Sequence, residues 1–154
     1  MRIKHLVTTA AAALAAAVVV AAPASADPSP QFDPGIDYVA IELLSIYCNK
    51  NSEGGHDEAY LNMDGGKVWP RSVRYQTMGA GYTRSMTDAN GIDAFRIPVY
   101  EERGFSLWDY DSTSGDDALG SFAVRGDEVG TTQTKRISGS GGSYTVTYRV
   151  VDVP

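Results

Sequence analysis

Toward its end the chain alternates apolar and polar residues with a period of two, and this pattern limits the folds it can form. Tyr144, Val146, Tyr148 and Val150 alternate with two threonines and Arg149. Because successive side chains of a strand point to opposite faces, the segment predicts a strand with one buried face. No convincing segment after residue 38 shows the 3.6-residue apolar period of an amphipathic helix. The sequence therefore favours an all-β fold.

Other strand-like runs are short and are separated by turns rich in Gly, Asn, Asp and Ser. Pro98 indicates an edge strand, because proline cannot donate to a ladder. The tripeptide Asp64-Gly65-Gly66 is typical of a hairpin tip, and residues 138–143 (SGSGGS) of a flexible connector. About seven or eight such strands without helices predict an antiparallel β-sandwich. The expected strands are 39–47, 59–63, 67–69, 71–76, 95–99, 105–107, 119–124 and 144–150.

The start of the chain matches a cleavable secretory signal peptide. Arg2 and Lys4 form a cationic start, residues 9–22 form an uninterrupted apolar run, and Ala24-Ser25-Ala26 supplies the small residues of a cleavage site. The apolar run is shorter than the roughly 20 residues that cross a bilayer, and no later run approaches that length. We therefore expect a secreted, extracellular protein whose mature part has no transmembrane segment. The expected parts are a signal peptide at 1–26, an extended, proline-rich lead-in at 27–37 and one domain at 38–154.

The charge balance narrows the choice of partner. The chain has 13 basic and 19 acidic residues, and the predicted leader holds two of the basic residues and none of the acidic ones. The exported part therefore has 11 basic and 19 acidic residues, which gives a formal charge of −8 with histidine neutral. Such a chain lacks the basic footprint of a nucleic-acid-binding protein, and direct attraction to an anionic membrane is disfavoured without a bridging cation. We expect no nucleic-acid partner.

The residues that carry nucleophilic or zinc chemistry are scarce. Cys48 is the only cysteine, so the chain has no internal disulfide, and its place after an apolar run favours a small buried hydrophobe. His56 is the only histidine beyond the predicted leader, and the sequence has no G-x-S-x-G nucleophile elbow. We expect a non-catalytic protein, with a secreted hydrolase left open as an alternative.

Four carboxylates lie within nine residues after the apolar run that ends at Trp108, namely Asp109, Asp111, Asp116 and Asp117. Like charges this close repel unless something positive lies among them. A hard cation is the natural candidate, because Ca²⁺ takes six to eight oxygen ligands. The alternative to a cation site is an acidic turn whose charges are solvated.

An EF-hand loop beginning at Asp109 would need glycine at its sixth position and glutamate at its twelfth. Those positions hold Ser114 and Gly120, and the flanking segments are predicted strands. The sequence therefore excludes an EF-hand.

The spacing of the aspartates in this segment resembles the third calcium-binding loop of C2 domains. Asp109-x-Asp111 is followed six residues later by Asp117 and then by Ala118-Leu119-Gly120. The earlier segment 49–61 is similar to the first calcium loop of the family, with Asp57 ahead of a short aromatic-containing strand. The resemblance implies that this chain is a small secreted bacterial protein with a C2-like, calcium-binding β-sandwich domain. It implies that the two loops lie side by side.

The resemblance also implies which side chains hold the ion. Its first-choice Ca²⁺ ligands are Asp57, Asp109, Asp111 and Asp117. Its weaker candidates are Asn51, at a position where the family usually has aspartate, Glu58, which replaces Asp57 if the alignment slips by one, and Asp116, which is expected to face solvent or to cap the loop.

Two functional hypotheses remain. The first is a non-catalytic, calcium-binding C2-like module for an unknown extracellular ligand, which is a lipid, a polysaccharide or a protein. The second is a protein-interaction or inhibitor domain in which calcium is only structural. Exposed aromatic rings can stack on sugars or anchor a protein interface. The residues considered for that role are Trp69, Tyr75, Tyr82, Tyr100 and Tyr110, with Tyr110 singled out because it lies inside the acidic loop.

Overall fold

The computed structural model describes residues 37–91 and 95–153. The predicted signal peptide at 1–26 and all of the predicted lead-in before residue 37 lie outside the described residues. Within those ranges, no helix has the length and apolar character to cross a membrane. The elements are β1 (Tyr38–Lys50), β2 (Asp57–Met63), β3 (Gly66–Trp69), β4 (Gln76–Met78), β5 (Thr83–Ser85), the 3-10 turn η1 (Thr87–Ala89), β6 (Arg96–Pro98), β7 (Glu102–Asp109), β8 (Asp117–Arg125), β9 (Gln133–Gly139) and β10 (Gly142–Asp152).

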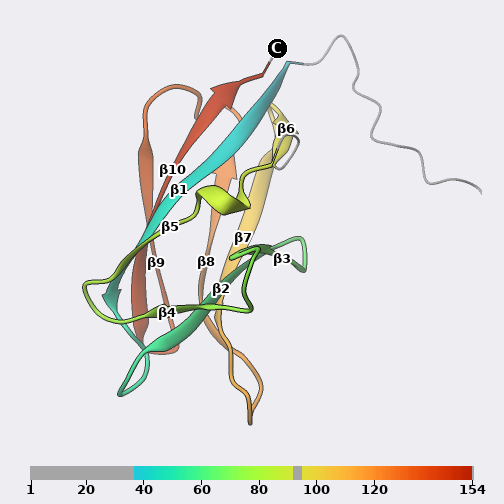
Figure 1. The fold of residues 1–154 in the computed structure, drawn as a ribbon. Helices are drawn as coiled ribbons and strands as arrows, with labels where there is room; N and C mark the ends of the chain where they lie inside the picture. The colour runs from blue at the N-terminus through green and yellow to red at the C-terminus, as the bar shows by residue number, and fades with distance from the viewer. Residues whose placement is uncertain (1–36, 92–94, 154) are drawn as a thin grey trace, which may run out of the picture. The chain divides into compact units, whose positions relative to one another are not determined.

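The strands form two sheets that enclose one hydrophobic core (Figure 1). One sheet has the order β5-β1-β10-β9, and β6 also pairs with β1. The other has the order β3-β2-β7-β8, and β4 also pairs with β2. All of these pairings are antiparallel. The predicted all-β antiparallel sandwich is confirmed, with ten strands in the described ranges rather than about seven or eight.

The core lies where the period-two pattern predicts it. The four apolar residues of the alternating run in β10 are buried, and burial alternates in the same way along β7. In β1 the alternation shifts, because the register with β10 slips between Leu43 and Ser45. Such an irregularity changes which residues face inward, and after it Ile46 and Cys48 point into the core. The expectation that Cys48 acts as a small buried hydrophobe agrees with this position.

Two turn predictions have different outcomes. Asp64 and Gly65 form the tip of the β2–β3 hairpin with positive φ angles of 50° and 80°, as the sequence predicts. The flexible connector predicted at 138–143 is wrong, because β9 runs through Gly139 and β10 begins at Gly142. Only two residues remain between them, both with positive φ, so the segment is a tight hairpin. Ser138 and Ser143 pair in the ladder, and Ser140 lies in the turn.

The strand predicted at 71–76 is also wrong over most of its length. Residues 71–74 are bends, and the strand β4 begins only at Gln76. The Lys67 ammonium donates hydrogen bonds to the carbonyl oxygens of Val73 at 2.6 Å and Arg74 at 3.1 Å. A side chain therefore satisfies carbonyls that a neighbouring strand would otherwise take, and the β3–β4 loop is held in place on the sheet.

Two strands were not expected from the sequence. β9 has polar residues at most positions and buries only Ile137, while β5 has three residues. Both lie at an edge of their sheet, where one side of the strand faces solvent and the apolar pattern is correspondingly weak. Pro98 in β6 confirms the expectation of an edge position, because β6 pairs with β1 alone.

The two sheets approach each other closely where β8 passes β9. A Cβ atom on Gly139 would lie 2.6 Å from the Ala118 carbonyl oxygen, and one on Gly120 would lie 3.0 Å from the Ser138 backbone. Gly120 also has a φ of 131°, which L side chains rarely adopt. Glycine at these two positions therefore lets the edges of the two sheets meet backbone to backbone.

Candidate functional site

The two predicted acidic loops leave the same end of the sandwich. β2 begins at Asp57 and pairs with β7, which ends at Asp109, so the loops at 51–56 and 110–116 emerge from neighbouring strands (Figure 1). Asp117 is the first residue of β8 and pairs with Asp109. The strand order therefore brings the predicted ligands to one end, and the position of each side chain decides what that end can hold.

Asp57 is fully buried and holds the first loop in shape. Its carboxylate accepts hydrogen bonds from the Ser52 amide at 2.9 Å, the Ser52 hydroxyl at 3.0 Å and the Glu53 amide at 3.3 Å. The Tyr144 hydroxyl donates to the same carboxylate from β10. Burial and this contact with a carboxylate raise the pKa of Tyr144. Asp57 thus links the loop to both sheets.

Asp109 is buried beside Asp57 but has fewer partners. Its side chain is 2% exposed, and in the described residues its carboxylate accepts one hydrogen bond, from the Glu58 amide at 2.5 Å. Desolvation raises the pKa of Asp109 to about 7, and the negative charges of Asp57, Glu53 and Glu58 add to the rise. A proton or a cation bound at this carboxyl group would therefore stabilise the folded protein.

The other predicted ligands are engaged elsewhere. The Asp111 carboxylate accepts from the Ser114 hydroxyl at 2.9 Å. The Asp116 carboxylate accepts from the Asp111 amide at 3.2 Å and from the Tyr60 hydroxyl at 2.6 Å, so it caps the second loop. Burial and this bond raise the pKa of Tyr60 to about 12. Asp117 is exposed.

The weaker candidates follow the same pattern. The Asn51 amide nitrogen donates to the carbonyl oxygens of Glu53 at 2.6 Å and Gly55 at 2.9 Å, and its side-chain oxygen accepts from the Ala80 amide at 3.3 Å. Glu58 is only half-buried, with Asp57 and Ala59, its buried neighbours in β2, on the opposite face. Neither side chain joins the buried pair.

The residues present fit a calcium ion only in part. The structure brings Asp57 and Asp109 together and leaves Asp111 and Asp117 apart from them. Within 37–91 and 95–153, no group of three or more His, Cys, Asp or Glu side chains is arranged to hold a metal ion. Ca²⁺ requires six to eight oxygen ligands, so two carboxylates supply a charge match but not a complete shell. The four-aspartate site stays a prediction.

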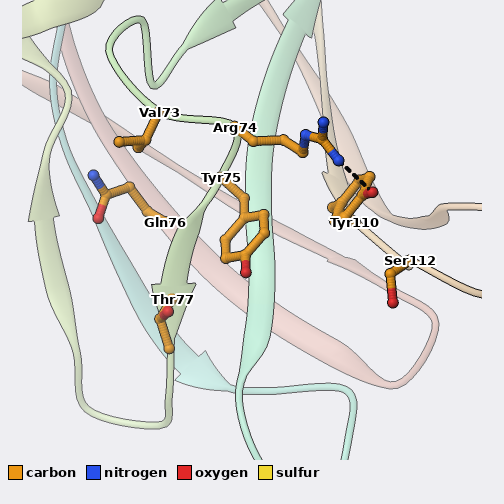
Figure 2. Close-up of a pocket in the computed structure, with 7 residues that line it drawn as sticks. All are labelled: Val73, Arg74, Tyr75, Gln76, Thr77, Tyr110 and Ser112. Carbon is orange, nitrogen blue, oxygen red and sulfur yellow. Dashed lines mark hydrogen bonds between the residues drawn. The ribbon is translucent and has the colours of Figure 1, made fainter.

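A second candidate site lies on the outer face of the sheet that contains β2, β4 and β7. An open pocket of about 640 Å³ is lined by Val73, Arg74, Tyr75, Gln76, Thr77, Tyr110 and Ser112 (Figure 2). Its lining comes from the β3–β4 loop, from β4 and from the start of the acidic β7–β8 loop. Its volume lies in the roughly 300–1,000 Å³ range of small-ligand sites.

Two tyrosines and one arginine define this pocket. The rings of Tyr75 and Tyr110 stack with centroids 5.6 Å apart and an interplanar angle of 18°. Arg74 lies over the Tyr110 ring at 4.9 Å and donates to its hydroxyl at 2.5 Å, as the dashed line in Figure 2 shows. The Tyr110 amide donates to the Glu58 carbonyl at 3.0 Å, which fixes Tyr110 against the edge of the sheet.

Sequence reasoning considered Tyr75 and Tyr110 as ligand contacts but missed Arg74, Gln76 and Ser112. A signal was available in the alternation. Since Asp109 points inward, Trp108 and Tyr110 must point outward, and Trp108 pairs with Tyr60 across the sheet. Aromatic residues on an outward face are not needed by the core, so their presence there indicates a surface with another role.

Comparisons with known proteins found likenesses only among solved structures. No protein-family model matches the chain, and no curated protein matches it. Among solved structures, a C2 domain of plant extended synaptotagmin 1 aligns with 77% of this chain and 97% of its own, at 9% identity and a TM-score of 0.45. A second C2 domain structure aligns with 76% of this chain and 99% of its own, at 13% identity and a TM-score of 0.40.

Human GIVD cytosolic phospholipase A2 aligns with 77% of this chain, at 16% identity and a TM-score of 0.46, and the match covers 17% of that protein. The strand pairings make the chain an all-β antiparallel sandwich, and these C2 domains are among the solved structures to which it is similar. At these identities and scores the resemblance assigns no ligand, ion or site residue to it.

Proposed function

We propose that this protein is a secreted, non-catalytic binding module that takes its ligand in the pocket on the outer face of the sheet containing β2, β4 and β7. The observation that carries the proposal is the Tyr75–Tyr110 stack with Arg74, which forms an open aromatic site on the face opposite the core. The loop on one side is anchored by Lys67, so the pocket is largely preformed.

The reactive side chains support a non-catalytic role. Cys48 is buried, and desolvation raises the pKa of its thiol, which disfavours the nucleophilic thiolate. The His56 Nε2 atom lies 3.3 Å from the Tyr82 hydroxyl, and the two rings are tilted by 40° with their centroids 5.4 Å apart. Neither residue lines the pocket. The described residues that line the pocket therefore offer stacking surfaces and hydrogen-bonding groups, and no histidine, cysteine or carboxylate is among them.

Binding by this face predicts a loss of ligand when the rings are removed. We expect the protein to co-sediment with at least one probe among cellulose, chitin, cross-linked polygalacturonate and vesicles of phosphatidylcholine with phosphatidylserine. The double variant Tyr75→Ala and Tyr110→Ala is expected to weaken that binding about tenfold or more, because two stacking surfaces are lost. Tyr100→Ala is the matched control, since Tyr100 is exposed and lies outside the pocket.

Retention of full binding by the double variant would contradict the proposed site. Sedimentation with vesicles alone, and only with Ca²⁺ present, would instead favour a calcium-dependent lipid module. A single protein captured from the medium and retained in EDTA, with every other probe unbound, would favour the protein-interaction alternative. Each outcome therefore selects one reading.

We also propose that calcium, where it binds, is a structural ion at the Asp57–Asp109 pair. Both carboxylates are buried, so an ion between them would be shielded from a large ligand and would not bridge to one. The single hydrogen bond of Asp109 supports this assignment, because its carboxylate retains capacity for a cation. A cation there would offset the repulsion between the two carboxylates.

Calcium is expected to raise the melting temperature by several degrees. Extracellular sites commonly bind with a Kd of about 10⁻⁴–10⁻³ M. Ca²⁺ at 10 to 100 times Kd adds roughly 1–3 kcal/mol to the free energy of unfolding. Thermal melts in Ca²⁺ and in EDTA measure the shift. Asp109→Asn should abolish it and Asp117→Asn should leave it unchanged, whereas equal loss in both variants would restore the four-aspartate site.

A further inference from the structure

We infer that the Tyr75–Tyr110 pocket takes an acidic saccharide, a chain of hexuronate units whose carboxylate is held by Arg74. The inference rests on the proposed binding function and names the ligand class of that same pocket. It follows from three features of the site: the two aromatic faces, the polar groups around them, and a single unpaired cation.

The aromatic and polar groups of the pocket match the two kinds of surface on a sugar ring. A pyranose has apolar C–H faces, which stack on an aromatic ring, and a rim of hydroxyl groups, which need donors and acceptors. Tyr75 and Tyr110 stack on each other, so the ring faces that they offer to a sugar are those turned away from the stack. Thr77 and Ser112 supply two hydroxyls to the lining of the pocket. A few polar groups placed around aromatic walls are what fix the orientation of a small ligand.

Arg74 supplies the charge that selects an acid. It is the only charged residue among the seven that line the pocket. Within 37–91 and 95–153, its guanidinium contacts Tyr110, and no carboxylate pairs with it. A guanidinium has five N–H donors in a planar fork that matches a carboxylate, and the contact with Tyr110 uses one of them. The remaining donors are available to a ligand.

The nearby acids do not occupy this cation. Asp111 accepts from Ser114, and Asp116 accepts from Tyr60 and from the Asp111 amide. Lys67 holds the loop carbonyls at Val73 and Arg74, so the backbone that carries the guanidinium is fixed at the rim. In a chain with an acidic excess, an arginine left without an acid beside two aromatic faces favours an anionic ligand that also stacks. A lone phosphate headgroup would leave the tyrosine faces unused.

The test compares two ligands with the same sugar backbone, one with free carboxylates and one with neutral methyl esters. Calorimetric titration in EDTA would use a tetramer of α-1,4-linked galacturonate and the same tetramer with every carboxylate methyl-esterified. We expect the acidic tetramer to bind and the affinity of the ester to be lower by about tenfold or more, because a charge-assisted hydrogen bond is lost. EDTA keeps calcium bridging between carboxylates out of the measurement.

Variants assign the effect to individual residues. Arg74→Gln should lower the affinity for the acidic tetramer about tenfold and leave that for the ester unchanged. Tyr75→Ala should weaken both. Arg136→Gln, on a strand of the other sheet, is the matched charge control and should change neither.

The inference is overturned if Arg74→Gln binds the acidic tetramer as the parent protein does, or if acid and ester bind equally. In the second case sugar binding would remain and the proposed function would stand. If neither tetramer binds while cellulose or chitin still co-sediments through the tyrosine pair, only the acidic specificity fails. If no probe binds and the double tyrosine variant changes nothing, the proposed function fails too.

Discussion

Asp57→Ala is expected to lower the free energy of unfolding by about 3–5 kcal/mol. The substitution removes the acceptor for the Ser52 and Glu53 amides and for the Tyr144 hydroxyl at a position with no solvent access. The Tyr144 hydroxyl would be a buried donor left without a partner, which costs about 1–3 kcal/mol, and the two amides of the part-buried loop lose their acceptor as well. Urea denaturation followed by tryptophan fluorescence measures the change. The first acidic loop should lose its shape even if the sandwich survives.

Two further variants keep this prediction testable if Asp57→Ala does not fold. Tyr144→Phe removes one donor and leaves the backbone bonds to Asp57, so a loss of about 1–2 kcal/mol is expected. Asp117→Ala changes an exposed aspartate at the same end and should stay within about 0.5 kcal/mol of the parent. Equal effects of Asp57→Ala and Asp117→Ala would show that the buried hydrogen bonds do not hold the loop.

Without a cation, the protein is expected to lose stability as the pH rises from about 4 to about 7. The folded state raises the pKa of Asp109 from 3.8 to about 7, so between these values it binds more protons than the unfolded chain does. The contribution of this group is therefore fully present below pH 4 and is lost as the pH rises through 7. The loss is at most about 4 kcal/mol, because one unit of pKa corresponds to about 1.4 kcal/mol.

Asp109→Asn should remove this slope. Asparagine cannot ionise, and its side-chain oxygen can still accept from the Glu58 amide. Melting temperatures in EDTA at pH 5 and pH 8 should therefore differ by roughly 10 °C in the parent protein, and this difference should largely vanish in Asp109→Asn. Asp111→Asn is the matched control and should keep the parent slope. If Asp109→Asn keeps the pH dependence of the parent protein, a group other than Asp109 is responsible for it.

The sequence predicted the fold wherever a strand buries one face. Alternation located β7 and β10 because a half-buried strand must separate apolar from polar residues. Alternation missed β9, because an edge strand buries few side chains. It also misplaced the strand at 71–76, because the residues there have a strand-like sequence but form a loop whose carbonyl at Val73 is held by Lys67. Composition identifies neither the edge strand β9 nor the loop at 71–74, since both depend on which strand or side chain packs beside them.

The site was predicted less completely than the fold. The resemblance to C2 domains implied that the two acidic loops lie side by side, and the strand pairing places them at one end of the sandwich. Spacing could not show that Asp57 and Asp109 turn inward while Asp116 caps its own loop. Those orientations depend on partners far away in sequence, such as Tyr144 and Tyr60. The pocket at Arg74 could not be predicted for the same reason, since its walls come from two loops and one strand that are distant in sequence.

The close approach of β8 and β9 has a consequence for the behaviour of the protein in a crowded solution. These are the longest strands at the edges of their sheets, and Gly120 and Gly139 let them cover each other. The opposite edges are formed by β3, β4, β5 and β6, which have only three or four residues each. Another chain that tried to add a strand would find no long template in the described residues. The two glycines thus protect the sandwich against self-association through its edges, which matters for a protein proposed to work away from cellular chaperones.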